Sequence, residues 1–376
     1  MISLASRLHS SGSSVLLAAL EHRYYGLSYP APKATSWKTL EYLSSFQAVS
    51  DVASFAQAIN LTFKVSPKWV TYGGSYPGMI SAWSRLLFPS VIHAAVSSSS
   101  PVQAQLDMGE YNDWTARTLT QETVGGSKEC LARVEEGHEA VAKLLAGGLA
   151  GGAEDRKALA EMFNVCDIEG LEDPLEPLRN RQLFAGDGLV FVPSQSNDPA
   201  CASPLCNIES VCASFLSDPT EQPLESLARV AAEQRTGNQC VGVDWAANLS
   251  YLSSEAARLG GTHSWLYQTC NEFGFYQTCE TGSGCPYAKG YHPLDQDLEM
   301  CSTVFGIDAQ TVEANVANSL AFYGGWSLEG GTRILSVNGN IDPWSTLAVT
   351  DSNPEIEYEG ECLPAFWVDQ ASHHFW

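Results

Sequence analysis

The chain has 376 residues, of which 44% are hydrophobic and 10% aromatic. This length allows two or three domains and this composition supplies a packed core, which excludes a largely disordered protein. Forty-three acidic against 20 basic residues give a net charge of −23, which would repel nucleic-acid phosphates and anionic lipid headgroups. No uninterrupted apolar run approaches the ~20 residues of a membrane-spanning helix, so we expect neither a nucleic-acid partner nor a membrane span.

Charge and cysteine content divide the chain into two regions of different character. Residues 1–100 hold seven basic and three acidic residues, whereas residues 101–376 hold thirteen and forty, together with all eleven cysteines. Tight spacings around Cys201 and Cys279 would also suit zinc. Because no histidine lies beside them at zinc-finger spacing, we favour disulfide bonds in an oxidising compartment.

Two further features bear on cellular location. The triplets Asn60-Leu-Thr and Asn248-Leu-Ser are candidate N-glycosylation sites and fit a secretory route. No signal peptide is visible, because no basic segment at the N-terminus leads into an apolar core. We therefore expect a secreted, endosomal or lysosomal protein whose true start is missing from this chain.

The first 105 residues alternate between short apolar runs and amphipathic segments. We expect strands at 15–20, 68–72 and 91–97 and helices at 40–59 and 77–88. This alternation predicts an α/β fold with a parallel sheet.

Beyond this region the apolar spacing becomes helical, as at 130–145 and 155–163, with glycine-rich or proline-rich breaks. The glycine-rich stretch 147–152 indicates a link between helices, since no strand precedes it and no Lys-Ser/Thr pair follows it. Strands are expected again at 333–337 and 365–368. The predicted organisation is a first core part (1–105), a mostly helical insertion (106–329) and a second core part (330–376).

The strongest signal for chemistry is Ser75, which follows an apolar strand in the sequence Gly73-Gly-Ser-Tyr-Pro-Gly78. A serine held in a sharp strand-to-helix turn between small residues is typical of the nucleophile elbow of α/β-hydrolases. Pro77 replaces the last glycine of that pattern, and proline suits the first turn of a helix. The N–H of Tyr76 is the expected oxyanion donor. An ordinary tight turn is the alternative.

Two later segments offer partners for this serine. Asp342 follows the expected strand 333–337, and His373 and His374 follow the strand 365–368. Each segment alone could be a plain turn or a surface loop. Together they give the chain order Ser, Asp, His, which is the order of α/β-hydrolases. The sequence does not separate the two histidines, and the six others, which lack a position after a strand, are predicted to be structural or surface residues.

Five motifs occur in a fixed order along the chain. They are Glu21-His-Arg-Tyr-Tyr-Gly26, Gly73-Gly-Ser-Tyr-Pro-Gly78, Tyr267-Gln-Thr-Cys-Asn-Glu-Phe-Gly274, Asn338-Gly-Asn-Ile-Asp-Pro-Trp344 and Ser372-His373. In this order they resemble the lysosomal Pro-X carboxypeptidase and dipeptidyl peptidase II family of serine peptidases. The third motif and Tyr323-Gly-Gly are similar to the thymus-specific branch of that family.

The resemblance implies an α/β-hydrolase core with a large, mostly helical cap inserted between nucleophile and acid. It implies a triad of Ser75, Asp342 and His373, the first histidine being chosen because the thymus-specific branch keeps only that one. The implied activity is that of a serine exopeptidase that cleaves short peptides through an acyl-enzyme, with cleavage next to proline as one alternative. No metal and no organic cofactor is implied.

Further roles come from the same resemblance. Met79 and Trp344 match positions that form an apolar substrate pocket in proline-specific members, with core packing as the alternative. Glu272 is a candidate for binding a charged peptide end or a buried structural carboxylate. Glu21 and Arg23 are predicted to form a structural ion pair that anchors the loop beneath the site.

Two departures from the family pattern leave other functions open. Residues 1–14 contain no glycine-rich loop that could supply a second oxyanion donor, whose loss typically costs roughly 10²–10³ in rate. The family's first strands are thus expected to be missing, and the chain also ends two residues after His374, where the family continues into a helix. The alternatives are an inactive relative that only binds, or an esterase. Which peptide end is cut, how the cysteines pair and whether a homodimer forms stay open.

Overall fold

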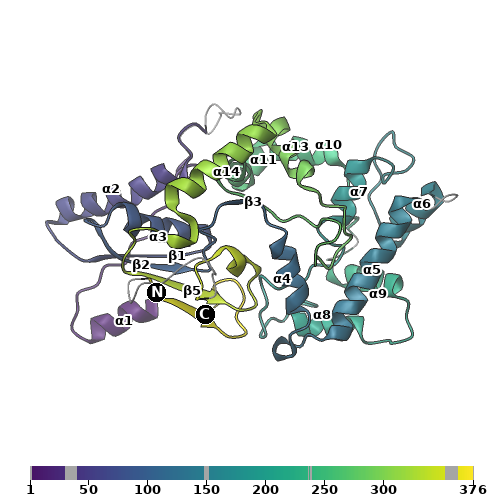
Figure 1. Cartoon of the computed structure of the whole chain (residues 1–376), viewed down its shortest axis with the longest axis horizontal. Helices are drawn as coiled ribbons and strands as arrows, with labels where there is room; N and C mark the ends of the chain where they lie inside the picture. The colour runs from purple at the N-terminus through teal and green to yellow at the C-terminus, as the bar shows by residue number, and fades with distance from the viewer. Residues whose placement is uncertain are drawn as a thin grey trace.

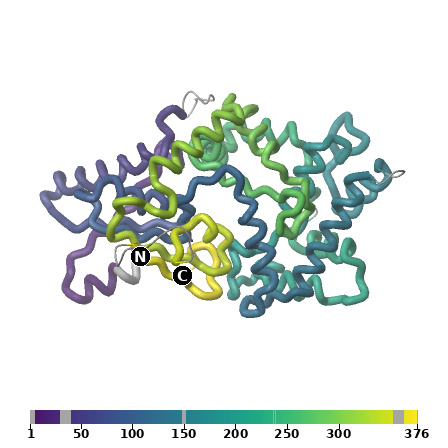
Figure 2. The backbone as a smooth tube through the Cα atoms, viewed as in Figure 1, coloured from purple at the N-terminus to yellow at the C-terminus, as the bar shows by residue number. Residues whose placement is uncertain are grey.

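The computed structural model describes residues 2–29, 40–147, 152–235, 237, 239–351 and 363–375. Figure 1 shows a parallel sheet with α1–α3 at one end of the molecule and a larger group of helices at the other. Figure 2 shows that the chain passes from the sheet to these helices after β2 and returns to the sheet for β5.

The sheet-forming part comes from both ends of the sequence. Its elements are α1 (Ile2–Ser10), α2 (Ser45–Phe63), β1 (Trp69–Gly74), α3 (Tyr76–Leu87), β2 (Ile92–Ser98), β5 (Ile334–Gly339), the turn η5 (Pro343–Leu347) and β6 (Ala365–Val368).

The intervening residues are mostly helical. Their elements are β3 (Gln105–Asp107), α4 (Glu110–Thr118), η2 (Glu122–Val124), α5 (Lys128–Ala146), α6 (Gly152–Met162), α7 (Leu178–Ala185), α8 (Ile208–Phe215), α9 (Pro223–Gln234), α10 (Trp245–Leu252), α11 (Glu255–Leu259), α12 (Thr262–Gln268), η3 (Thr269–Phe273), β4 (Gly274–Tyr276), α13 (Leu294–Phe305), α14 (Ala309–Tyr323) and η4 (Gly325–Ser327).

The main sheet has the strand order β1-β2-β5-β6, and all neighbours run parallel. Its register pairs Gly74 with Ser98, Ser98 with Val337, and Gly339 with Val368. The carboxyl ends of these strands therefore lie at one edge, where open α/β sheets bind their ligands. The loops that follow β1, β5 and β6 carry the three predicted catalytic residues to this edge.

Most predicted elements match observed ones to within a few residues. The expected strands at 68–72, 91–97, 333–337 and 365–368 correspond to β1, β2, β5 and β6, and the helix at 77–88 corresponds to α3. The helix expected from residue 40 begins later, at Ser45, because the side chain of Ser44 caps it by accepting a hydrogen bond from the N–H of Gln47. Helices α5 and α6 lie where the apolar spacing predicts them.

The strand expected at 15–20 is wrong. In the described part of the chain these residues have no sheet partner, and their apolar side chains remain exposed, with Leu16 62% exposed. An apolar run forms a buried strand only if another strand is available to pair with its backbone. The periodicity of the sequence does not show whether such a strand is present.

The predicted ion pair between Glu21 and Arg23 is also wrong. The guanidinium of Arg23 instead pairs with Asp51 of α2 at 2.6 Å. The carboxylate of Glu21 accepts hydrogen bonds from the N–H of Leu27 and the hydroxyl of Ser28, so it closes its own loop. Glu21 and Arg23, two positions apart in the motif, therefore hold two different segments: Glu21 holds its own loop and Arg23 holds α2.

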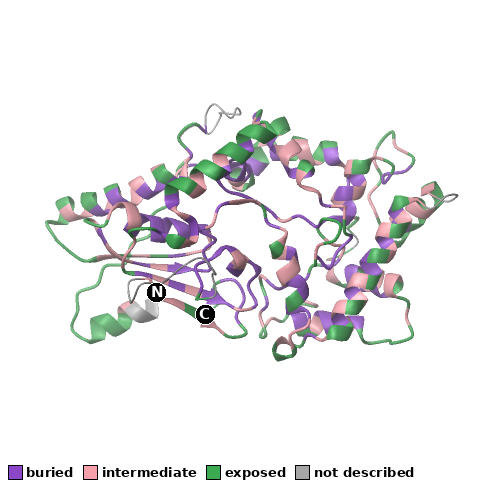
Figure 3. Ribbon diagram, viewed as in Figure 1, coloured by how far each residue is buried: buried purple, intermediate pink, exposed green. Residues whose placement is uncertain are grey.

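Separate apolar clusters support the sheet and the helical part, and Figure 3 shows buried residues at both ends of the molecule. Beneath the sheet, Met79 and Trp83 of α3 are buried, and the Trp83 ring stacks on Tyr323 of α14 with centroids 3.6 Å apart. This contact ties the last long helix of the insertion to the helix that follows the elbow. Packing in the other cluster involves α5, α7, α8 and α9.

Disulfide bonds join ten cysteines, as the spacing analysis favoured over zinc. The pairs are Cys130–Cys212, Cys166–Cys240, Cys201–Cys206, Cys270–Cys301 and Cys279–Cys285. Cys362 and most of the glycine-rich link at 147–152 lie outside the described residues. Across the described part of the chain, no helix has the length and apolar character needed to cross a bilayer.

We predict unequal stabilisation by two of these disulfides. Cys130–Cys212 links positions 82 residues apart, whereas Cys201–Cys206 links positions 5 apart. Loop-closure entropy then gives a loss of about 4–5 kcal/mol for Cys130→Ala/Cys212→Ala and about 2 kcal/mol for Cys201→Ala/Cys206→Ala. Guanidinium unfolding monitored by circular dichroism measures both losses. Equal losses would contradict the prediction.

Candidate active site

Ser75 lies between β1 and α3 in a conformation that is rare for a residue with a side chain. Its φ is +59° and its ψ is −134°, and its N–H donates to the carbonyl of Ser98 on the neighbouring strand at 2.9 Å. Such a backbone costs of order 1–3 kcal/mol and persists only where the surroundings impose it. The serine is half-buried at the carboxyl edge of the sheet.

Small residues around Ser75 make this turn sterically accessible. A Cβ on Gly73 would collide with the carbonyl of Pro77, and a Cβ on Gly78 would collide with the hydroxyl of Ser100. Pro77 itself is exposed in the first turn of α3, where proline costs no helical hydrogen bond. In the general pattern, the glycine two residues after the serine lets the backbone approach its neighbours closely. Here Gly78, three residues after Ser75, has that role.

Tyr76 is the first residue of α3. Its N–H has no acceptor within the helix, because the first N–H groups of any helix lack one. It follows the nucleophile candidate directly, at the positive end of the helix, where developing negative charge is stabilised. The role of this N–H as an oxyanion donor stays a prediction.

Asp342 and His373 are held together by a short hydrogen bond. His373 Nδ1 lies 2.8 Å from Asp342 Oδ2. Asp342 is completely buried after β5, and its other oxygen accepts the N–H of Trp344 at 3.0 Å. Because a carboxylate only accepts, the proton of neutral His373 resides on Nδ1.

The second ring nitrogen of His373, Nε2, is buried and has no hydrogen-bond partner in the described structure. The loop that carries it packs against the elbow. A Cβ on Gly74 would lie 3.1 Å from the ring of His374, and the N–H of His374 donates to the hydroxyl of Ser99 at 2.9 Å. The structure thus pairs His373, and not His374, with Asp342, while the ring of His374 lies against Gly74.

Gln195 of the helical part also contacts this site, and the sequence offered no signal for it. Its backbone carbonyl accepts the N–H of His373 at 3.1 Å. Its side-chain oxygen accepts from the indole of Trp344 at 2.9 Å and from the hydroxyl of Tyr111 at 2.7 Å. The insertion therefore orients the histidine loop directly.

The residues suggested for an apolar substrate pocket occupy different environments. Met79 is fully buried under the elbow. Trp344 is partly exposed, and its ring makes edge contacts with Tyr111 and Phe275. Trp344 can meet a bound molecule, whereas Met79 supports the site from within the core.

Glu272 is buried within the third sequence motif. Both its oxygens accept the N–H of Ser45 at 2.9 Å, and one accepts the hydroxyl of Ser45 at 2.6 Å. Burial raises the pKa of Glu272 to about 7, although the hydrogen bonds from Ser45 and Gln268 lower it. This environment is that of a structural carboxylate at the N-terminus of α2.

A hydrogen-bonded group beside the elbow includes His22, which the sequence analysis set aside. The hydroxyl of Tyr76 lies 3.0 Å from His22 Nε2 and accepts from Gln268 Nε2 at 2.8 Å. The hydroxyl of Tyr25 donates to Gln268 Oε1 at 2.7 Å. His22, Tyr25, Tyr76 and Ser75 together line a hollow of about 560 Å³. The Glu-His-Arg-Tyr-Tyr-Gly motif was the one available signal for this placement.

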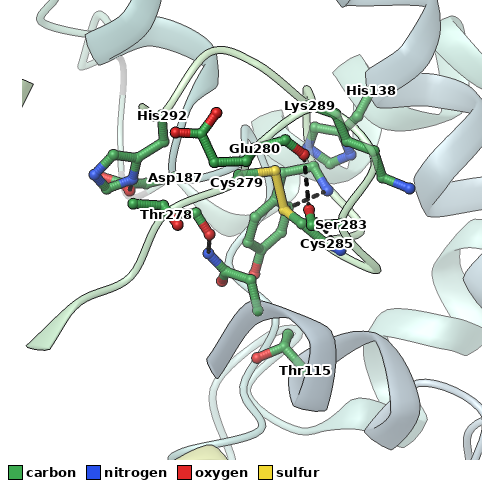
Figure 4. Close-up of a disulfide and its surroundings, with 12 residues drawn as sticks. Thr115, His138, Asp187, Thr278, Cys279, Glu280, Ser283, Cys285, Lys289 and His292 are labelled. Carbon is green, nitrogen blue, oxygen red and sulfur yellow. Dashed lines mark hydrogen bonds and ion pairs between the residues drawn. A yellow bond between two sulfur atoms is a disulfide. The ribbon is translucent and has the colours of Figure 1, made fainter. Parts of the chain in front are cut away.

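A second cavity, of about 410 Å³, contains a charged group. His292 lies between Asp187 at 2.6 Å and Asp297 at 3.0 Å, and Figure 4 shows His292 and Asp187 near the disulfide Cys279–Cys285. Burial lowers the pKa of His292, but the two carboxylates outweigh it and raise the pKa to about 10. The sequence did not single out this cluster.

The candidate glycosylation sites both lie within helices. Asn60 is in α2, where its side-chain oxygen accepts from the indole of Trp69 at 3.0 Å, and Asn248 is in α10. Both side chains are half-buried. Their modification stays a prediction.

Comparison with known proteins agrees with the motifs. Residues 10–375 match the family described as serine carboxypeptidase S28. The chain is 38% identical over 367 residues to the thymus-specific serine protease of Mus musculus, covering 96% of this chain and 69% of that protein. With the Homo sapiens protein of that name it is 38% identical over 344 residues, which is 90% of this chain and 65% of the relative.

A more distant relative is the lysosomal Pro-X carboxypeptidase of Bos taurus, 24% identical over 374 residues, with 96% of this chain and 68% of that protein covered. The chain spans about two thirds of the length of these relatives. The resemblance inferred from the five motifs is therefore confirmed, including the likeness to the thymus-specific branch.

We predict that Glu272 makes stability depend on pH. A carboxyl whose pKa rises on folding, here from 4.5 to about 7, stabilises the fold fully below its unfolded pKa and loses that contribution as pH rises through 7. The effect is at most about 3 kcal/mol. Urea unfolding between pH 4.5 and 7.5 should show a shallower loss of stability in Glu272→Gln than in the unmodified chain. The exposed Glu280→Gln is the control, and identical slopes in all three proteins would contradict the prediction.

Proposed function

Because the chain belongs to the serine carboxypeptidase S28 family of serine peptidases, we propose that it is an exopeptidase that cleaves short peptides through an acyl-enzyme on Ser75. The observation that carries the proposal is the 2.8 Å pair of Asp342 and His373 at the sheet edge where Ser75 has its strained turn. Nucleophile, base and orienting acid on this edge are what acyl transfer needs.

In the proposed reaction, Ser75 Oγ attacks the peptide carbonyl carbon and its proton passes to His373 Nε2. Asp342 accepts the Nδ1–H bond, which fixes the tautomer and stabilises the imidazolium that forms. The N–H of Tyr76 donates to the oxygen that becomes negative. His373 then protonates the leaving amine, and water, activated by the same imidazole, releases the acyl group and restores Ser75.

Limitation to short peptides is proposed from the position of the helical insertion. Gln195, in a turn of this insertion, bonds to the backbone of His373 and the side chain of Trp344, so residues of the insertion border the site directly. Such a border, acting as a cap, would admit peptide ends more readily than folded chains. The partly exposed ring of Trp344 is an apolar surface on which a proline ring could pack.

A secreted, endosomal or lysosomal location is proposed on three grounds. The five disulfides require an oxidising route, two sequons are present, and a lysosomal relative exists among the matched proteins. The net charge of −23 is partly neutralised in an acidic lumen.

Labelling with a fluorophosphonate tests the nucleophile. We expect the probe to modify Ser75 alone and Ser75→Ala to remain unlabelled, because only an activated serine reacts. Peptide mapping by mass spectrometry locates the adduct, and circular dichroism establishes that both proteins are folded. A folded chain that takes up no probe would favour the alternative of an inactive relative. Turnover of esters without turnover of peptides would favour the esterase.

Paired histidine variants test the base. We expect His373→Gln to lower kcat by about 10⁴-fold or more, whereas His374→Gln retains activity within about tenfold, because only His373 contacts Asp342. Steady-state hydrolysis of a short peptide provides the rates. The reverse ranking would transfer the role of the base to His374.

A further inference from the structure

We propose that the hollow beside Ser75 is a substrate subsite that binds one large, uncharged apolar side chain of the peptide. This inference rests on the proposed function and adds the chemical class of side chain that the enzyme prefers. The hollow is the 560 Å³ space described above, within the range of about 300–1,000 Å³ found for ligand pockets.

Its position places it within reach of the scissile bond. Ser75, Tyr76 and Pro77 of the elbow form one side, the loop with His22 and Tyr25 forms another, and Thr262 and Trp265 of α12 close it from the insertion. A peptide whose carbonyl lies at the Ser75 hydroxyl must direct a neighbouring side chain past these walls. Residues from both parts of the molecule therefore shape this subsite.

The polar side-chain groups of His22, Tyr25 and Tyr76 at its wall are already hydrogen-bonded within the protein. The carbonyl of Arg23 accepts from His22 Nδ1 at 2.6 Å, so the proton of the neutral ring is on Nδ1 and Nε2 must accept from the hydroxyl of Tyr76. That hydroxyl in turn accepts from the amide of Gln268, whose oxygen accepts from the hydroxyl of Tyr25. This chain of hydrogen bonds leaves each of its groups with a partner.

A ligand in this hollow would therefore contact mainly the faces and edges of aromatic rings. Tyr76 packs against Trp265 with ring centroids 5.7 Å apart and against His22 at 5.4 Å. No residue that lines the hollow carries a carboxylate, an ammonium or a guanidinium. A charged side chain would lose water here without gaining a partner, whereas an apolar side chain gains from the burial.

Tight contacts hold the two walls in place. A Cβ on Gly261, directly before α12, would lie 3.3 Å from the ring of Tyr25. Burial also lowers the pKa of His22 and thereby favours the neutral ring on which the hydrogen-bond directions depend. Tyr25 is a wall residue outside the elbow whose hydroxyl is linked to Tyr76 through Gln268, and Tyr25→Phe separates the loss of its ring from the loss of that hydrogen bond.

Peptide binding to Ser75→Ala tests the inference, because this background measures binding without turnover. Short peptides that carry Phe, Leu, Ala, Asp or Lys at each position next to the scissile bond are titrated by calorimetry. We expect one position at which Phe and Leu bind at least about tenfold more tightly than Asp and Lys. Adding Tyr25→Ala should reduce this preference to about threefold or less, whereas adding Tyr25→Phe, which keeps the ring, should retain it.

A second variant keeps the test valid if Tyr25→Ala does not fold. Thr262→Glu adds a carboxylate to the wall at the start of α12, a position that favours an acid. It should shift the preference from Phe toward Lys. A preference that neither variant changes, or the absence of any apolar preference in the parent, would overturn the inference.

Failure of this inference can be told apart from failure of the proposed function. If Ser75 reacts with fluorophosphonate but no position prefers apolar side chains, the subsite is wrong and the peptidase stands. If Ser75 does not react and yet Tyr25→Ala abolishes an apolar preference, the subsite stands in a protein that binds peptides without cleaving them.

Discussion

The parallel alignment of β1, β5 and β6 is the constraint on which the candidate site depends. Because parallel strands end at one edge, the loop after β1, which follows Gly74, converges there with the loops that follow Gly339 of β5 and Val368 of β6. The edge alone does not make a catalytic site. Ser75 also requires a backbone with φ of +59°, and Asp342 requires a buried position where its carboxylate meets His373 at 2.8 Å. Sheet geometry provides proximity, and local packing provides orientation.

The helical insertion contributes to this edge at two places. At one, the backbone and side chain of Gln195 bond to His373, Trp344 and Tyr111. At the other, Gln268 bonds to Tyr76, the residue after the nucleophile. Because both contacts use directional hydrogen bonds, a shift of the insertion would disturb the proposed base, His373, and the proposed oxyanion donor, Tyr76, together.

Two buried ionisable groups of the insertion, Glu272 and His292, have different environments. Glu272 receives the N–H and hydroxyl of Ser45 and thereby fixes the start of α2, with a pKa raised to about 7 by burial. His292 lies between two carboxylates in the second cavity, where the ion pairs outweigh burial. In both places hydrogen bonds or ion pairs offset part of the lost hydration.

The sequence by itself determined the local elements and the order of the catalytic candidates. The strand, two glycines, serine and helix around Ser75 form a pattern of a few residues, so short-range chemistry suffices to predict it. Only the tertiary structure decided that His373 meets Asp342, how ten cysteines pair and that His22 lies beside Ser75. The tertiary structure also shows that residues 15–20 have no sheet partner in the described chain and that Arg23 forms its ion pair with Asp51. These outcomes depend on contacts between distant segments, and a single sequence specifies them only through the packing of the whole fold.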